Sequence, residues 1–306
     1  MKELQKECKV CPRECGVDRI QGNYGYCGKS SKIMVARAAL HLWEEPCITG
    51  KKGSGTIFFS GCPLHCIFCQ NYEISRGKKG QEESYGKEVS ISGLKEIMLK
   101  LQEKEASNIN LVTGTHYIPQ IAEALILAKQ EGLTIPVVFN TGGYEKVESL
   151  RRLEGLVDIY LPDLKYFSPK LSKEYCNAED YFEVTKEAIE EMVRQVGSPV
   201  FDIENKMKRG VMVHHMILPG STKDSMKIME YLLQNYGNKI YISLMNQYTP
   251  MKQVSNHPLL KRKVTAREYK KVIDYALSLG WEHGFIQDKE TAKESFIPIW
   301  NGEGVE

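Results

Sequence analysis

The chain has 306 residues, of which 42% are hydrophobic and 26% are charged. This length and composition predict a globular protein whose core is large enough for one α/β barrel or two smaller domains. The net charge of +2 and the short, scattered basic runs argue against nucleic acid as a partner, because such runs are usually solvated surface.

The beginning of the chain and its hydropathy predict where the protein resides. The first seven residues are charged, and no apolar stretch follows them, so they do not resemble a secretory signal. We find no run of about 18 apolar residues, the length that a membrane-spanning helix needs. We therefore expect a cytoplasmic protein with no membrane partner. Thiols stay reduced in that compartment, so nine cysteines that fall largely in groups indicate metal ligation rather than disulfides.

The first group of cysteines lies in a Gly-rich stretch with little hydrophobic periodicity. It comprises Cys8, Cys11, Cys15 and Cys27. We expect residues 1–50 to form a Cys-rich metal-binding module and linker, because so small a unit needs a cross-link in place of a core. Four thiolates make a closed zinc site or ligate a second, auxiliary iron–sulfur cluster, and the spacing does not decide between them. Free thiols are a third reading.

Short apolar runs rich in β-forming residues alternate with helical patterns over residues 51–306, which we expect to form the main domain. The predicted strands cover residues 56–60, 109–112, 136–140, 157–161, 211–218 and 239–244. Helical spacing is present over residues 94–101, 121–128, 226–233 and 265–279. Strand followed by helix, repeated about six times, predicts a parallel barrel or an open parallel sheet. The polar stretch 77–90 is predicted to be a surface loop.

A second group of cysteines directly follows the first of these strands. Cys62, Cys66 and Cys69 are separated by three and then two residues, and Phe68 precedes the last of them. Three thiolates can hold three irons of a cubane cluster and leave the fourth iron without a protein ligand. A structural zinc site would need a fourth ligand, and only His65 is close in sequence. The spacing therefore favours a [4Fe–4S] cluster with one open iron.

Polar and small residues follow the other predicted strands. The loops after parallel strands converge at one edge of the sheet, so we expect these residues to line one cofactor site. Only one of His214 and His215 can face the interior, because side chains alternate along a strand. The candidates are Thr113, Gly114, Thr115, His116, Asn140, Thr141, Asp163, Lys165, His214 and Gln247. Other readings are an ordinary surface ion pair for Asp163 and Lys165, a structural histidine at His116 and a plain loop at Gln247. Cys47 and Cys176 are predicted to be isolated thiols.

The cysteine spacing with Phe68 resembles the signature of the radical S-adenosylmethionine (SAM) superfamily. The resemblance implies an α/β fold, a partial (β/α)6 radical SAM barrel, with the last helix and the tail around residues 296–300 closing its edges. It also implies that SAM binds the open iron and that the residues at the strand ends surround SAM. One electron, supplied by a donor such as flavodoxin or ferredoxin, then cleaves SAM to methionine and a 5′-deoxyadenosyl radical that abstracts hydrogen from a substrate.

Most of the chain is similar to a radical SAM family of pyruvate formate-lyase activating protein-like sequences. Residues 139–144 and 161–165 resemble segments of glycyl-radical-enzyme activases, in which this region surrounds the ribose and carboxylate of SAM. The chain departs from the activase pattern where Asn140 replaces an acid and His214 an arginine. The resemblance implies that His214 faces the interior near the carboxylate of SAM and that His215 packs outward. The resemblance implies a glycine of a partner protein as the substrate. The alternatives are a small molecule, a peptide or RNA, or a non-catalytic iron–sulfur or zinc protein that binds partners.

Overall fold

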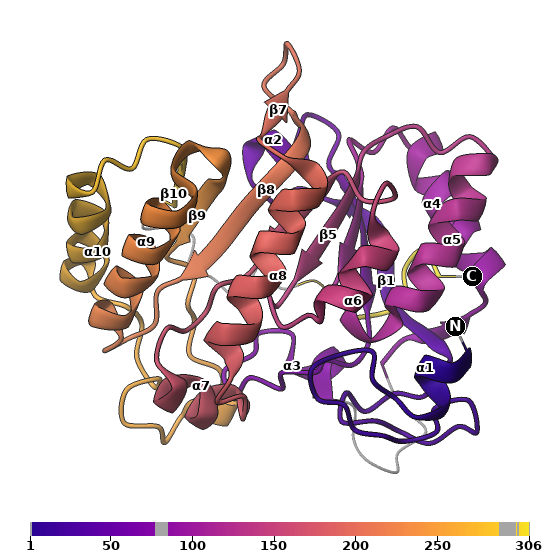
Figure 1. Cartoon of the computed structure of the whole chain (residues 1–306), viewed down its shortest axis with the longest axis horizontal. Helices are drawn as coiled ribbons and strands as arrows, with labels where there is room; N and C mark the ends of the chain where they lie inside the picture. Colours follow the sequence, from indigo (N-terminus) through magenta and orange to yellow (C-terminus); the bar gives the residue numbers. More distant parts are fainter. Residues whose placement is uncertain (1, 77–84, 288–297, 299, 306) are drawn as a thin grey trace.

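Parallel strands form the centre of the computed structural model, which describes residues 2–76, 85–287, 298 and 300–305 (Figure 1). All six predicted strands are present, and each lies beside the next in parallel register. They are β2 (Ser54–Phe59), β4 (Ile109–Val112), β5 (Val137–Thr141), β6 (Ile159–Pro162), β8 (Met207–Met216) and β9 (Tyr241–Met245). The prediction of an α/β fold with a mostly parallel sheet is therefore confirmed.

Four further strands are present, three at the edges of the sheet and one, β7, paired antiparallel with the first part of β8. They are β1 (Ile33–His41), β3 (Lys87–Val89), β7 (Val200–Phe201) and β10 (Gly284–Ile286). β10 pairs in parallel with β9, whereas β1 pairs antiparallel with β2, and β3 with β1. The pairings of the described residues run from β10 to β3 without joining these two strands, so the barrel is partial, as predicted.

Helices cover the outer side of the sheet (Figure 1). The four predicted ones are α4 (Ile91–Glu103), α5 (Ile118–Gln130), α9 (Thr222–Tyr236) and α10 (Ala266–Ser278). The remaining helices are α1 (Lys2–Lys6), α2 (Pro46–Thr49), α3 (Tyr72–Arg76), α6 (Val147–Leu150), α7 (Pro169–Cys176) and α8 (Tyr181–Val196). Apolar residues at helical spacing, such as Leu94, Ile97 and Leu101 of α4, pack into the same core as Leu111 and Phe139 of the strands. None of the described helices is long and apolar enough to cross a lipid bilayer.

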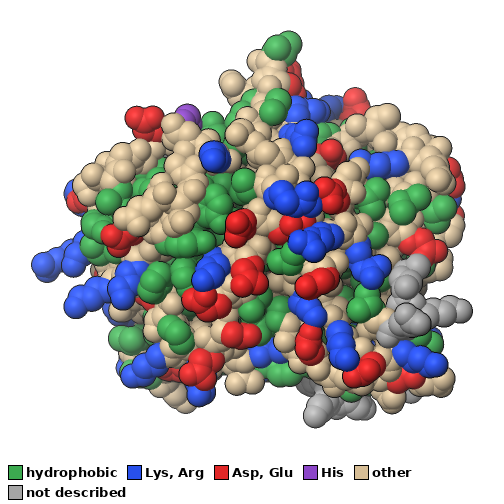
Figure 2. Space-filling model, in the orientation of Figure 1, with side chains coloured by type: hydrophobic (Ala, Val, Ile, Leu, Met, Phe, Trp, Pro, Cys, Tyr) green, Lys and Arg blue, Asp and Glu red, His purple; other side chains and the backbone are tan. Residues whose placement is uncertain are grey.

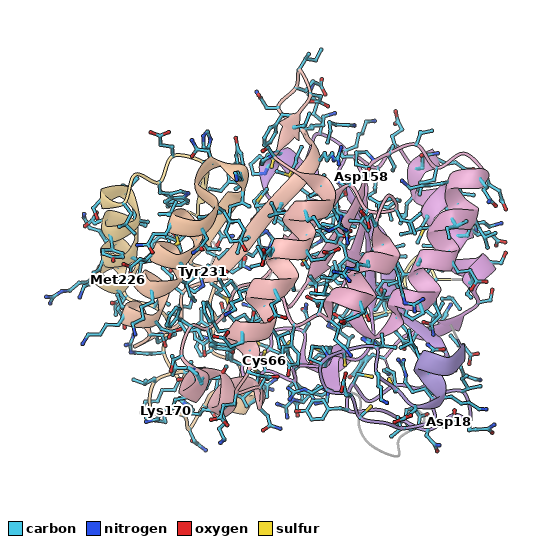
Figure 3. All side chains as sticks on the ribbon, viewed as in Figure 1. Asp18, Cys66, Asp158, Lys170, Met226 and Tyr231 are labelled. Carbon is cyan, nitrogen blue, oxygen red and sulfur yellow. The ribbon has the colours of Figure 1, made fainter. Side chains whose placement is uncertain are left out.

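The inner side of the barrel is filled at one end and hollow at the other. Inward-facing Val138, Ile159 and Met212 pack against Cys47 and Ile48 of α2, so α2 fills the amino end. In Figure 3, Asp158, which precedes β6, and Cys66 lie at opposite ends of the strands. The space inside the carboxyl end is therefore left to the candidate site.

Two predicted segments differ from the structure or lie partly outside it. The loop predicted for residues 77–90 is wrong at its end, because residues 87–89 form β3 against the edge of β1; residues 77–84 lie outside the described residues. Of the tail predicted to close the barrel edges, residues 296, 297 and 299 are also outside the described part. Trp300 contacts Phe58 with 5.2 Å between ring centroids, and Ala38 donates its N–H to the carbonyl of Glu303 at 2.8 Å. The described part of the tail thus packs on β1 and β2.

Charged side chains of both signs are interspersed over the face shown in Figure 2. The short basic runs at residues 51–52 and 261–263 belong to this mixed surface pattern, and Lys51 and Lys52 each pair with a glutamate. Isolated exposed pairs of this kind contribute little to stability.

Candidate active site

A cavity of about 590 Å³ occupies the carboxyl end of the barrel and brings most of the predicted residues together. This volume lies within the range of about 300 to 1,000 Å³ that is usual for ligand sites. The predicted residues among its lining are Cys62, Cys66, Phe68, Cys69, Thr113, Asn140, Thr141, Asp163, Lys165, His214 and Gln247. Gly114, Thr115 and His116 are not among the lining residues. Six strand ends thus contribute to one space, as parallel topology requires.

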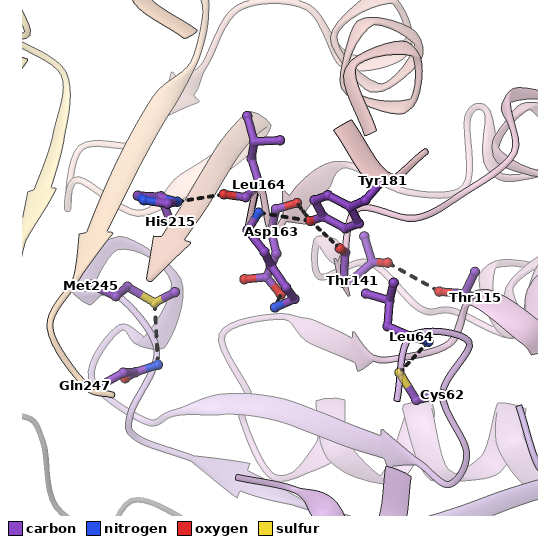
Figure 4. Close-up of polar contacts among 12 residues, drawn as sticks. Cys62, Leu64, Thr115, Thr141, Asp163, Leu164, Tyr181, His215, Met245 and Gln247 are labelled. Carbon is purple, nitrogen blue, oxygen red and sulfur yellow. Dashed lines mark hydrogen bonds and ion pairs between the residues drawn. The ribbon is translucent and has the colours of Figure 1, made fainter. Parts of the chain in front are cut away.

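The loop that carries the three cysteines is held in place by neighbouring loops. Gly61 has a φ of +92°, and a Cβ at this position would lie 2.7 Å from the carbonyl oxygen of Cys27, so only glycine fits. The Sγ atom of Cys62 accepts the N–H of Leu64 at 3.4 Å (Figure 4). A Cβ on Gly142, in the loop after β5, would lie 2.7 Å from Leu64. The close approach of these loops fixes the thiols at the wall of the cavity.

The donor set of this loop fits an iron–sulfur cluster better than a single metal ion. Within the described residues, no three His, Cys, Asp or Glu side chains are gathered closely enough to hold one ion. A cubane has different requirements, because each thiolate binds a separate iron. Burial raises the pKa of the Cys62 thiol to about 12, and bonding to a metal is what deprotonates such a thiol.

The prediction that Cys176 is an isolated thiol is wrong. Cys176, at the end of α7, interacts with Cys66, and a hydrogen bond between the two thiols contributes most to raising the pKa of Cys66. The Cys176 thiol also donates to the carbonyl oxygen of Ser172 at 3.1 Å. Sequence reasoning missed the contact because α7 is more than 100 residues away in the chain. Cys47, in contrast, packs in the apolar cluster at the amino end.

Asp163 and Lys165 form an ion pair at the wall of the cavity, near Cys66. Lys165 Nζ lies 2.5 Å from Asp163 Oδ2. Burial opposes the charge of Lys165, but the Asp163 carboxylate outweighs it and raises the pKa of the lysine. Tyr181, which the sequence did not suggest, places its hydroxyl 2.8 Å from the carbonyl oxygen of Gly142 and 2.9 Å from that of Asp163 (Figure 4). This hydroxyl ties the ends of β5 and β6 together and thereby positions the ion pair.

The turn after β4 is divided between the cavity and the protein interior. Thr113 lines the cavity and has a φ of +60°, a strained conformation for a β-branched residue. Thr115 instead donates to the carboxylate of Glu145 at 2.8 Å behind the cavity wall. Burial raises the pKa of Glu145 to about 7. His116 is buried, contacts the carbonyl oxygen of Ser60 at 2.9 Å and has its pKa lowered to about 3 by burial, so it supports the cysteine loop from outside the cavity.

Gln247 closes the cavity on the side of β9. Gln70, next to the last motif cysteine, donates to the carbonyl oxygen of Gln247 at 3.1 Å. The Gln247 side chain lies 3.5 Å from the sulfur of Met245 (Figure 4) and accepts from Gln287 at 3.3 Å. The first and last elements of the barrel thus meet around the same space.

Comparison with known proteins identifies this arrangement. A sequence model of the radical SAM superfamily matches residues 56–232, which include the three cysteines and the strand ends from β2 to β8. The chain belongs to the radical SAM superfamily. Membership implies an enzyme that uses a [4Fe–4S] cluster and SAM for radical chemistry.

One relative and two solved structures are similar to this chain over most of its length. "Uncharacterized protein MJ0674" of Methanocaldococcus jannaschii is 27% identical over 278 residues, which are 90% of this chain and 75% of that protein. The FeFe-hydrogenase maturase HydG from Carboxydothermus hydrogenoformans matches with a TM-score of 0.53 and 13% identity over 79% of this chain and 55% of its own. SuiB from Streptococcus suis, solved bound to precursor peptide SuiA, matches with a TM-score of 0.50 and 13% identity over 75% of this chain and 47% of its own. The chain spans about half the length of these two solved proteins, and their likeness shows the fold.

The floor of this radical SAM cavity carries a buried charged pair that the sequence did not reveal. His214 faces the cavity and its Nε2 lies 3.1 Å from Glu45 Oε1, whereas His215 faces away and contacts the carbonyl oxygen of Leu164 at 2.7 Å (Figure 4). Burial opposes a charge on His214, but Glu45 outweighs it and raises the pKa of the imidazole to about 9. The imidazolium in turn overcomes burial and lowers the pKa of Glu45 to about 2.

The four cysteines of the N-terminal module interact electrostatically beside the radical SAM cysteine loop, although within the described residues no three of them are gathered closely enough to hold one ion. The Sγ atoms of Cys15 and Cys27 lie 3.1 and 3.7 Å from the position that a Cβ on Gly25 would take, and Cys62 donates its N–H to the carbonyl of Cys27 at 3.3 Å. Two buried cations adjoin the group. Arg19, fully buried, has Nη1 4.0 Å from Cys8 Sγ and 2.6 Å from the carbonyl oxygen of His116, and Lys29 is 3% exposed. In the part of the chain that the structure describes, neither cation pairs with a carboxylate, which fits a site whose thiolates carry negative charge.

Proposed function

We propose that this protein is a radical SAM enzyme in which Cys62, Cys66 and Cys69 bind the [4Fe–4S] cluster and the adjoining cavity binds SAM. The observation that carries the proposal is that all three thiols line the same cavity as the polar ends of the neighbouring strands. The bound cluster supplies reductive cleavage of SAM, and the resulting 5′-deoxyadenosyl radical abstracts a hydrogen atom from the substrate.

The protein's own residues would bind and orient SAM in this cavity. Lys165 offers a cation beside the thiols, because its charge interacts with both Cys66 and Cys69. Thr113, Asn140, Thr141 and Gln247 offer hydroxyl and amide groups at consecutive strand ends. Gly114, Thr115 and His116 would act from behind the wall, by holding the loops in position. Such preorganisation reduces the free-energy cost of ordering the reacting groups.

We propose a glycine of a partner protein as the first substrate class, as in the activases that residues 139–144 and 161–165 resemble. A small molecule, a peptide or RNA is the second class. Activation of a partner protein should leave a persistent doublet radical in that partner by electron paramagnetic resonance (EPR). Modification of the second class should instead produce a stable product with a new mass.

The N-terminal cysteines are proposed to bind zinc or an auxiliary cluster. Four thiolates with Zn²⁺ carry a net charge of about −2, and so do four thiolates with an oxidised cubane of about +2. Arg19 and Lys29 match this charge in either case, so charge does not separate the two metals. We further propose flavodoxin or ferredoxin as the external electron donor and a cytoplasmic location.

Anaerobic reconstitution followed by SAM and dithionite tests the proposed function. We expect 5′-deoxyadenosine, measured by chromatography, from the wild-type protein and none from Cys66→Ala. Cys47→Ala is the matched control, because it removes a buried thiol outside the cavity and should retain SAM cleavage. Absence of 5′-deoxyadenosine from the wild type would support a non-catalytic metal protein, and full activity of Cys66→Ala would overturn the cluster assignment.

A further inference from the structure

Two adjacent carboxylates lie at the inner end of the cavity, across the barrel from the cysteine loop. Glu44 and Glu45 join β1 to α2, the short helix that fills the amino end of the barrel (Figure 1). Both line the cavity, and Glu45 is 8% exposed. Burying two neighbouring carboxylates is unfavourable unless they are paired, so their presence requires an explanation.

The fold of this segment does not depend on the two carboxylates. Pro46 begins α2 with a fixed φ, and the backbone carbonyl of Glu45 accepts the N–H groups of Ile48 at 2.8 Å and Thr49 at 2.9 Å. Asn108, which precedes β4, donates to the carbonyl oxygen of Ile48 at 2.7 Å. Backbone contacts therefore hold the segment, and a structural role does not account for the acidic side chains.

The polar atoms around the carboxylates are only partly paired. Glu44 Oε1 accepts the side-chain N–H of Asn110 at 3.0 Å, and Glu45 Oε1 faces His214. Among the described residues, Glu45 Oε2, Asn110 Oδ1 and Ser243 Oγ are buried without a well-aligned hydrogen-bond partner. Ser243 nevertheless lies close enough to Glu45 to help lower the pKa of that carboxylate. Ser243 is fully buried and lines the cavity, and Asn110 lies on the same face of β4 as the cavity residue Val112.

The chemistry of these atoms selects the kind of ligand. Carboxylate and amide oxygens only accept hydrogen bonds, and the serine hydroxyl can also accept, so the open positions call for a ligand that donates. Two carboxyl groups face one imidazolium here, while Asp163 and Lys165 neutralise each other nearby. Burial and the Glu45 carboxylate raise the pKa of Glu44 to about 7, as expected where a second positive charge is missing. An acceptor-rich site with excess negative charge favours a cation over a neutral donor.

The approach to this site is apolar. Leu42 and Trp43 line the same cavity immediately before the two glutamates and are 57% and 60% exposed. Phe58 and Phe285 also belong to the lining. An apolar wall that leads to a charged end fits a ligand with an aliphatic stem and a cationic head.

We propose that Glu44, Glu45, Asn110 and Ser243 form a substrate subsite that binds an alkylammonium group. The subsite lies in the same cavity as the thiols, so a ligand held there by its nitrogen would extend its carbon atoms toward the end of the cavity where SAM is proposed to bind. The substrate role of the subsite rests on the proposed function and narrows it to substrates with a protonated amine. The amine is carried either by a small molecule or by a lysine side chain of a peptide.

Calorimetric titration of the reconstituted full-length protein with n-butylammonium, without reductant, tests this subsite. We expect n-butylammonium to bind, and n-butanol and butyrate to bind at least about tenfold more weakly, because neither supplies a cationic donor. Glu45→Gln should weaken n-butylammonium binding about tenfold or more, whereas Glu187→Gln, an exposed change on α8, should not. Equal binding of n-butanol, or equal loss in the two variants, would overturn the subsite.

A second variant and a second ligand make the result independent of folding and of SAM cleavage. Ser243→Ala removes only the buried hydroxyl beside Glu45, and it should weaken n-butylammonium binding a few-fold while the circular dichroism spectrum stays unchanged. Nα-acetyl-lysine methylamide distinguishes a lysine of a peptide from a small molecule as the source of the amine. Tighter binding of this compound than of n-butylammonium assigns the amine to a peptide, and weaker binding assigns it to a small molecule. If the protein binds the amine but does not form 5′-deoxyadenosine from SAM, the proposed function is overturned and the subsite stands. If it forms 5′-deoxyadenosine but does not bind the amine, only the subsite is overturned.

Discussion

The two cysteine groups of this protein adjoin each other, but one borders an open cavity and the other is enclosed. Cys62, Cys66 and Cys69 form part of the wall of an open cavity among polar strand ends. The N-terminal group is enclosed, with three of its four cysteines buried, and Arg19 and Lys29 are buried beside it. An open metal position permits chemistry, whereas a closed set of four ligands stabilises structure. This difference supports the proposal that the first group carries the catalytic cluster and that the second stabilises the N-terminal module.

Exchanging one ligand in each group should produce the largest contrast. Cys66→Ala should eliminate SAM cleavage and change the melting temperature little, because it alters a cavity wall. Cys11→Ala should release the N-terminal metal and expose residues 2–32 to protease, because a small module folds only with its cross-link. Metal analysis, thermal melting and limited proteolysis of both variants check this. Equal protease resistance of Cys11→Ala and wild type would contradict a structural role for the N-terminal metal.

Removing the buried cation Arg19 should have the next largest effect, which falls on stability and on metal binding. Arg19→Met deletes the guanidinium that donates to the carbonyl oxygens of Ser30 and His116, and it leaves those acceptors buried. We expect the free energy of unfolding to fall by about 3 kcal/mol and the metal affinity of the N-terminal group to fall with it. Denaturant titration measures the first and chelator competition the second. Arg151→Met, at an exposed site, is the control, and an equal effect of the two changes would contradict the charge argument.

The carboxylate behind the catalytic cavity predicts a pH dependence of stability. Burial raises the pKa of Glu145 to about 7, so between about pH 4.5 and 7 the folded state binds more protons than the unfolded state, and stability falls as pH rises. Glu145→Gln should raise the free energy of unfolding at pH 8 by on the order of 1 to 2 kcal/mol and change it little at pH 4. Denaturant titrations at the two pH values measure this.

Glu148→Gln, three residues along and exposed, supplies the control for that pH dependence. It should leave the difference between the two pH values as in the wild type. If Glu145→Gln also left that difference unchanged, the carboxylate would not be held protonated behind the cavity wall.

Backbone strain at the cavity predicts the smallest effect. Thr113→Gly should stabilise the fold by about 1 kcal/mol relative to Thr113→Ala, because glycine accepts a φ of +60° and alanine does not. Both changes remove the same side-chain hydroxyl, so comparison of the two free energies of unfolding isolates the backbone contribution. Equal stabilities would show that the turn at the cavity is relaxed in both.

The sequence predicted those parts of the molecule that local patterns encode. Alternating apolar runs marked β2, β4, β5, β6, β8 and β9, and the spacing of three cysteines marked the loop that follows β2. Convergence of loops at the carboxyl ends of parallel strands then predicted that residues as distant as Thr113 and Gln247 would share one cavity. β1 was missed although its segment is apolar, because it falls in the stretch assigned to the N-terminal module and linker.

The contacts that the sequence could not predict join segments distant in the chain. Tyr181 acts on the end of β5 from the first turn of α8, and Cys176 contacts Cys66 from the end of α7. Glu45 pairs with His214 across the barrel. Nothing in the local pattern around these residues indicates a partner, because the partner is determined by how the strands curve around the cavity.

The binding of SAM to an open iron of the Cys62, Cys66 and Cys69 cluster is tested most directly by EPR. The reconstituted and reduced protein should give a [4Fe–4S] signal that changes when SAM is added. The same change should persist in Cys11→Ala and be absent from Cys66→Ala. A cluster signal that SAM leaves unaltered in the wild-type protein, or a SAM-dependent change that survives in Cys66→Ala, would contradict the account.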